Sequence, residues 1–166
     1  MDLYSRHYKD STIVNAPPKE VFAYIDDHER FSSHMSKSSW MMGGGRMDTI
    51  LDDGKGQKVD SHIRLKGKVF GVTVFLDEVV SVHEPPNKKT WETVGDLRLY
   101  VIGPYRMTVE LEARDDAHTH LQVSIEYDLP DNHAWLWQLF GRFYAKWCVR
   151  QMINGVRDYF VSLQRG

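Results

Sequence analysis

The chain has 166 residues, 42% of them hydrophobic, and a formal net charge of −2. This length fits one domain spanning residues 1–166 with a sizeable core. The nearly balanced charge gives no electrostatic reason to expect a nucleic acid as a partner. The only cysteine, Cys148, excludes a disulfide within the chain and a cysteine-based metal site. We expect neither a metal nor a cofactor.

The cellular location of the protein is indicated by two features that the sequence lacks. No apolar run is long enough to span a bilayer, and residues 1–6 contain no apolar segment typical of a secretory signal. A lone cysteine suits a reducing compartment. We therefore expect a cytoplasmic protein.

The first predicted elements are a short strand and an amphipathic helix. Thr12 and Val14 belong to a strand that ends at Pro17. Pro17 and Pro18 suit a helix start, where their missing N–H groups would be unpaired anyway. The next residues place Val21 and Ile25 on one apolar face. A second short helix or turn is expected over residues 30–36.

A loop should follow the second helix. Residues 38–47 contain Trp40, Met41 and Met42, followed by three consecutive glycines, Gly43 to Gly45. Because three glycines in a row hold no fixed shape well, we predict a mobile loop that forms part of a gate.

The middle of the chain predicts only strands. We expect them at 47–52, 57–70, 72–82, 90–94, 99–113 and 121–127, with a hairpin turn at 53–56. Residues 57–70 alternate between apolar and polar side chains, as in a half-buried antiparallel strand. Gly103-Pro104 is expected to bend the 99–113 strand or to form a bulge in it.

The last predicted element is a long helix that carries two apolar stripes. Its second half places Ala145, Val149, Met152 and Val156 on a core-facing side. An earlier stripe points roughly the opposite way and consists of Leu136, Phe140, Phe143 and Trp147. Either the helix breaks or kinks near Gly141, or the earlier stripe meets a second subunit, a membrane surface or another protein.

The order of these elements carries a family resemblance. The strand, the "NAPPKEVFAYIDDHERF" helix, the antiparallel strands, the "VVSVHEPPNKKTWETVG" segment and the long terminal helix together resemble the START/Bet v 1-like (SRPBCC) superfamily, of the polyketide cyclase/dehydrase and lipid-transport type. The resemblance covers almost the whole chain. It implies an α+β helix-grip fold, in which a curved antiparallel β-sheet wraps around a long C-terminal α-helix, with two short helices after the first strand. It also implies a pocket for an apolar or aromatic small molecule, without naming that molecule.

The residues expected to line such a pocket follow from shared strand phase and from the facing side of the helix. They are Ile63, Leu65, Leu76, Trp91, Tyr105, Met107, Tyr127, Met152 and Val156. The alternative is that these large apolar side chains are ordinary core.

Glu78 is the one acidic residue in phase with Val74, Leu76 and Val80. If that face points inward, burial would raise its pKa, and Glu78 could act as a general acid or base. Because Phe75 and Val79 make the other face apolar too, an exposed or salt-bridged Glu78 is the alternative. No other catalytic residue can be assigned from the sequence.

Two other features are weaker. His118 and His120 share a strand side, but two ligands at a turn without a third make a poor metal site, and a solvated hairpin end explains them. Cys148 falls in the apolar stripe and is expected to be a buried small hydrophobe.

Three functions remain open. The first is binding or transport of a hydrophobic small molecule between sheet and helix. The second is a cyclase- or dehydratase-like enzyme that uses the same pocket, with Glu78 or a tyrosine as acid or base. The third is a protein-interaction module whose docking patch consists of Trp135, Trp137, Phe140, Phe143 and Trp147. A homodimer or a membrane-surface contact would use the stripe of Leu136, Phe140, Phe143 and Trp147.

Overall fold

The computed structural model describes residues 4–33, 44–69, 71–95, 103–129 and 134–166. Within these ranges one antiparallel sheet holds seven strands in the order β1-β7-β6-β5-β4-β3-β2. The strands are β1 (Arg6–Val14), β2 (Met47–Leu51), β3 (His62–Val69), β4 (Val72–Glu84), β5 (Lys88–Val94), β6 (Tyr105–Asp115) and β7 (His118–Tyr127). The helices are α1 (Pro18–Asp26), α2 (His28–Phe31) and α3 (Ala134–Arg165).

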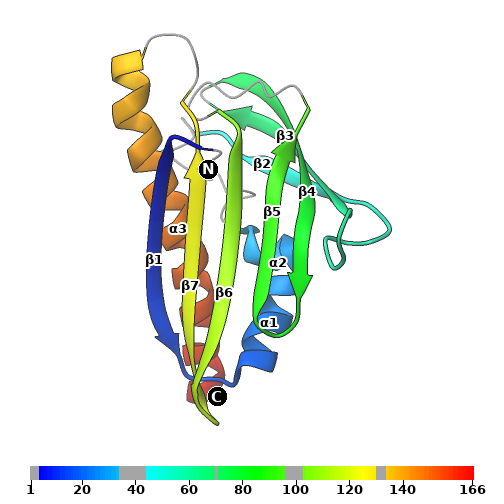
Figure 1. The fold of residues 1–166 in the computed structure, drawn as a ribbon, viewed down its shortest axis with the longest axis vertical. Helices are drawn as coiled ribbons and strands as arrows, with labels where there is room; N and C mark the ends of the chain where they lie inside the picture. The colour runs from blue at the N-terminus through cyan, green and yellow to red at the C-terminus, as the bar shows by residue number, and fades with distance from the viewer. Residues whose placement is uncertain (1–3, 34–43, 70, 96–102, 130–133) are drawn as a thin grey trace.

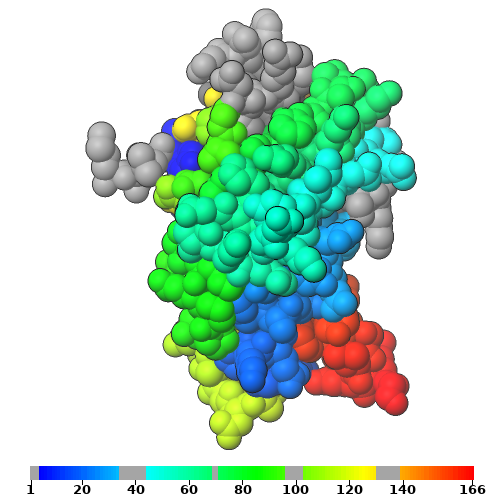
Figure 2. Space-filling view, turned by 90° about the vertical axis from the view of Figure 1, so that its right-hand side faces the viewer, coloured from blue at the N-terminus to red at the C-terminus, as the bar shows by residue number. Residues whose placement is uncertain are grey.

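The curved sheet and its long C-terminal helix form the helix-grip fold that was expected. In Figure 1 α3 runs behind β1 and β7, while α1 and α2 lie behind the other side of the sheet. Figure 2 shows that side filled in: the blue helices α1 and α2 sit between the strands β2–β4 and the red end of α3. The two predicted short helices between the first two strands are therefore confirmed.

The core lies between the inner face of the sheet and these three helices. Alternate residues of β4, β6 and β7 are buried, as the period of two in a strand requires. From α3 the buried side chains include Ala145, Val149, Met152 and Val156. The predicted core-facing stripe of the last helix is confirmed.

Three local predictions need correction. The strand expected over 57–70 begins only at His62, because residues 52–61 form turns held by Asp52, whose carboxylate accepts hydrogen bonds from Gly54 N, Ser61 Oγ and His62 N. Gly103-Pro104 does not bulge a strand: β6 begins after it, at Tyr105. The predicted glycine loop lies outside the described residues, except for Gly44 and Gly45.

The predicted break near Gly141 is wrong, because α3 is one helix from Ala134 to Arg165. Its first turns project beyond the start of β1 (Figure 1), so the beginning of the earlier stripe lies past the sheet, whereas Phe143 borders β1 and β7. Phe140 is 47% exposed and Phe143 57% exposed, whereas Trp147 is half-buried beside the Tyr144 ring. The side chains of Trp135, Leu136 and Trp137 lie outside the described ones, and a homodimer or membrane contact stays a prediction.

Among the described residues, no helix has both the length and the apolar character needed to cross a membrane.

Candidate functional site

The centre of the candidate site is a carboxyl group in the protein core. Glu78 follows Val74 and Leu76 in the inward phase of β4, and it is only 2% exposed. The inward phase of Glu78 is therefore confirmed and its exposure is excluded, whereas the salt-bridged alternative stays open and a role as acid or base stays a prediction. Because a carboxylate loses its hydration in such a position, burial raises the pKa of Glu78 to about 7.

Tyr105 is the principal partner of this carboxyl. Its hydroxyl donates a short hydrogen bond to Glu78 Oε1, which partly opposes the rise in the pKa of Glu78. Thr93 fixes the backbone of Tyr105: its Oγ1 accepts a hydrogen bond of 3.1 Å from Tyr105 N and donates one of 3.3 Å to Tyr105 O. A side chain of β5 thus aligns the first residue of β6 toward β4.

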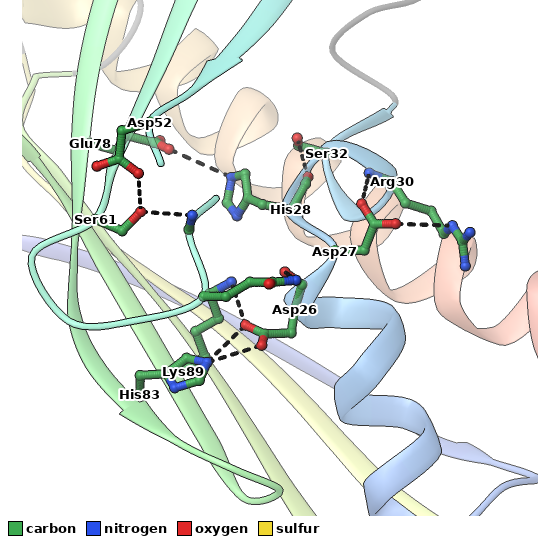
Figure 3. Close-up of polar contacts among 12 residues, drawn as sticks. Asp26, Asp27, His28, Arg30, Ser32, Asp52, Ser61, Glu78, His83 and Lys89 are labelled. Carbon is green, nitrogen blue, oxygen red and sulfur yellow. Dashed lines mark hydrogen bonds and ion pairs between the residues drawn. The ribbon is translucent and has the colours of Figure 1, made fainter. Parts of the chain in front are cut away.

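His28 closes the other side of the carboxyl. It begins the short helix α2, is 1% exposed, and places Nε2 3.8 Å from Glu78 Oε2 (Figure 3). Its ring meets the Trp91 ring edge-on, with 5.1 Å between the centroids. Gly56, with φ of +71°, lets the 52–61 segment pass close by: a Cβ there would lie 3.4 Å from the His28 Cβ.

The helix α3 adds Tyr144 and Cys148, which lie one turn apart and share a side-chain hydrogen bond. Burial raises the pKa of Tyr144 well above 10 and that of Cys148 to about 12. At neutral pH Tyr144 therefore keeps its hydroxyl proton and Cys148 is a thiol, not a nucleophile. Glu78, Tyr105, His28, Tyr144 and Cys148 are called the Glu78 cluster below.

The second carboxyl oxygen of Glu78, Oε2, has no hydrogen-bond donor among the described residues. A buried acceptor without a donor costs about 1–3 kcal/mol. The structure thus holds a polar atom in its core whose natural partner would be a ligand or a water molecule.

A second buried polar group lies beside the cluster and has a structural role. Lys89, with no exposed side-chain surface, places Nζ 3.0 Å from Asp26 Oδ1, and His83 Nε2 lies 2.9 Å from the same oxygen (Figure 3). Desolvation lowers the pKa of Lys89, and the Asp26 carboxylate opposes that change. These contacts tie the end of α1 to β4 and β5.

All nine predicted pocket residues are buried in the described core: Ile63, Leu65, Leu76, Trp91, Tyr105, Met107, Tyr127, Met152 and Val156. Of these, Tyr105 is the one that reaches Glu78 directly. Contact with a ligand stays a prediction for every one of them.

The sequence reasoning did not single out His28 and Tyr144. His28 lies seven residues after Val21 and three after Ile25, so it continues the apolar face of α1. Tyr144 lies four residues before Cys148, in the core-facing stripe. Both spacings could be read from the sequence. They did not distinguish His28 and Tyr144 as site residues, because histidine and tyrosine on an apolar face are common core residues.

No group of three or more potential metal ligands occurs in the part of the chain that the structure describes. His118 Nδ1 instead contacts the Asp115 carboxylate at 2.7 Å at the exposed β6–β7 turn.

The fold and this site define a helix-grip protein with a polar group set into an apolar interior. The family model for polyketide cyclase/dehydrase and lipid transport matches residues 5–159. The chain therefore belongs to the polyketide cyclase/dehydrase and lipid-transport family. No curated protein matches the chain in sequence.

Solved structures share the fold at low sequence identity. The Zhui aromatase/cyclase from Streptomyces sp. R1128 superposes with a TM-score of 0.71 at 11% identity, over 93% of each chain. A protein from Thermus thermophilus gives 0.65 at 12% identity, over 95% of this chain and 99% of that one. Ara h 8.0201 gives 0.64 at 11% identity, over 95% and 98%. At these identities the likeness concerns the fold.

Proposed function

We propose that this protein binds a hydrophobic small molecule between its sheet and α3, with the polar end of that molecule at the Glu78 cluster. The observation that carries the proposal is the position of Glu78 Oε2, a buried oxygen that no donor reaches among the described residues. A ligand hydroxyl placed there would supply the missing hydrogen bond. Family membership supports the same class of ligand.

The energetics favour a ligand that is mostly apolar. Met152, Val156 and Trp91 offer apolar surface, and burial of such surface contributes about 25 cal/mol per Å². The polar cluster adds little net affinity but fixes orientation, because a ligand without a hydroxyl or carbonyl leaves Glu78 unpaired.

Native mass spectrometry of protein purified under non-denaturing conditions tests the proposal. We expect an additional mass that is lost on denaturation. Uptake of the neutral dye Nile red provides the second readout. The variant Met152→Trp should fill the interior and abolish dye uptake, whereas Leu163→Trp, exposed on the same helix, should not. The proposal would be contradicted if no additional mass were found and the two variants took up the dye equally.

A second function, acid–base catalysis on the bound molecule, is favoured by one observation: the pKa of Glu78 is raised to about 7. A carboxyl with that pKa can both accept and return a proton at neutral pH. Such a step would move a proton from a carbon beside a carbonyl to Glu78, leave the electron pair on the enolate, and later return a proton to carbon.

Deuterium exchange at the α-carbon of 1-tetralone in D₂O, followed by NMR, isolates this step. We expect exchange by the wild type that rises as the pH passes through about 7 and that is lost in Glu78→Gln. Equal exchange by both proteins would exclude Glu78 as the base while leaving the binding proposal standing.

A further inference from the structure

A groove opens between the first half of α3 and the edge of the sheet formed by β1 and β7. Its volume is about 400 Å³. The strands contribute His7, Tyr8 and Tyr127 to its lining, and the helix contributes Leu139, Arg142, Phe143 and Lys146. This volume lies within the range of about 300–1,000 Å³ that is usual for small-molecule sites.

The helix side of the groove is a single face of α3. Arg142 and Phe143 lie three and four residues after Leu139, and four and three residues before Lys146, so the four side chains share one broad face of the helix. Leu139 is 55% exposed and Phe143 57% exposed. An apolar wall and two long cationic side chains therefore line the groove together.

This groove is separate from the Glu78 cluster. Cys148 and Phe143 are five residues apart, about 140° around the helix at the usual ~100° per residue. The cluster faces the core from one side of α3, and the groove opens on another. Occupation of one site does not require occupation of the other.

The charges of the groove have one sign. None of its seven lining residues is acidic. Neither Arg142 nor Lys146 forms an ion pair with any residue that the structure describes. Arg142 and Arg6 both act on the Tyr127 phenol, where they lower its pKa against the larger, raising effect of burial.

Two carboxylates close to these strands, Asp10 and Asp128, are already engaged. Asp10 Oδ2 lies 3.5 Å from Arg150 Nε and 3.3 Å from the Tyr8 hydroxyl, and Asp128 Oδ1 accepts two hydrogen bonds of 2.8 Å from Ser5. The groove thus presents unpaired positive charge beside apolar surface, in a protein whose overall charge is −2.

We propose that this groove binds an amphiphilic carboxylate, with its hydrocarbon chain along Leu139 and Phe143 and its carboxylate between Arg142 and Lys146. Charge complementarity selects the anionic head, because arginine and lysine at the mouth of an apolar site favour a carboxylate over a neutral group. The apolar wall selects the tail. The site is a second one, at the open edge between α3 and the sheet, and it shares only Tyr127 with the nine predicted pocket residues.

Isothermal titration with laurate, below its micelle concentration, tests the site. Laurate should bind the wild type, and dodecanol should bind more weakly. Removal of both cations in Arg142→Gln with Lys146→Gln should lower laurate affinity about tenfold or more. A matched control removes two exposed cations elsewhere, Lys66→Gln with Lys68→Gln on β3, and should leave the affinity unchanged.

Two further variants keep the outcome clear. Phe143→Glu, which places a negative charge in the groove, should also weaken laurate binding. Met152→Trp, which fills the interior, should not. If Met152→Trp abolished laurate binding while the double groove variant bound normally, the ligand would occupy the interior and the groove proposal would be wrong.

A final experiment distinguishes binding of a free carboxylate from binding to a lipid surface. Flotation with vesicles of phosphatidylcholine and phosphatidylglycerol should show no binding that depends on Arg142 and Lys146. Vesicle binding that depends on these residues, without binding of monomeric laurate, would overturn the proposal, as would equal affinities for laurate and dodecanol.

Discussion

The hydroxyl of Tyr105, at the start of β6, donates its hydrogen bond to the carboxyl of Glu78 in the middle of β4. The two strands are not neighbours, since β5 lies between them. The bond therefore spans the inner face of the sheet, where both groups are buried. It lowers the pKa of Glu78 against the larger, raising effect of burial.

The stability of the protein should depend on the protonation of Glu78. The folded-state pKa is raised from 4.5 to about 7 by burial. Between these two values the unfolded chain binds fewer protons at this site than the folded chain does, so stability falls as the pH rises. A shift of this size corresponds to about 3 kcal/mol at most. Urea unfolding of the wild type at pH 4.5 and pH 7.5 measures the change.

Glu78→Gln provides the comparison, because glutamine stays neutral throughout this range. The difference in unfolding free energy between Glu78→Gln and the wild type should move in favour of the variant as the pH rises from 4.5 to 7. Parallel pH profiles for the two proteins would show that Glu78 titrates at the same pH in the folded and unfolded states.

The hydrogen bond from Tyr105 lowers the pKa of Glu78, against the larger effect of burial. In Tyr105→Phe the carboxylate loses its donor, so the pKa of Glu78 should rise further above its ordinary value. NMR titration of the Glu78 side-chain carboxyl carbon in both proteins gives the comparison. Tyr8→Phe, in a half-buried tyrosine on the edge strand, serves as the control and should not move the Glu78 titration. An unchanged or lowered pKa in Tyr105→Phe would mean that the bond does not act on the carboxylate.

Local periodicity predicted the strands and placed Glu78 on one of two candidate inward faces of β4, whereas the helix-grip fold was expected from the order of the elements and its family resemblance. Val74, Leu76 and Val80 bracket Glu78 at a spacing of two, and in the structure this face is buried while Phe75 on the other face is 48% exposed. The phase of Tyr105 could be predicted in the same way. That the two residues meet could not, because it depends on strand order.

Other parts of the site depend on contacts between distant segments. Asp26 and Lys89 are 63 residues apart in the sequence. Nothing in the local sequence pattern distinguishes Lys89, which is buried, from its neighbour Lys88. The break near Gly141 was wrongly predicted for a related reason. Periodicity indicates which way Phe140 points, but not that the helix extends past the sheet.

The buried contact between Lys89 and Asp26 should be asymmetric under mutation. Asp26→Asn leaves the Lys89 ammonium buried without its counter-charge, whereas Lys89→Met leaves Asp26 with His83 at 2.9 Å. We expect Asp26→Asn to cost about 3–5 kcal/mol of unfolding free energy and Lys89→Met to cost less. Denaturant unfolding at pH 7 measures both. Lys88→Met, at an exposed ion pair with Glu110, should change stability by no more than about 1 kcal/mol. Equal losses at Lys88 and Asp26 would contradict this assignment.

Two aromatic residues one turn apart on α3 should differ sharply in their contribution to stability. Phe140 is 47% exposed, whereas Tyr144 is buried and hydrogen-bonded to Cys148. Phe140→Ser should therefore change the unfolding free energy by about 0.5 kcal/mol or less. Tyr144→Ala should cost about 3–5 kcal/mol, because it opens a cavity the size of an aromatic ring in the core. Thermal and urea unfolding of the two variants provide the measurement. If Phe140→Ser were as destabilising as Tyr144→Ala, the first turns of α3 would be covered in solution, and the groove beside them would not be open to a ligand.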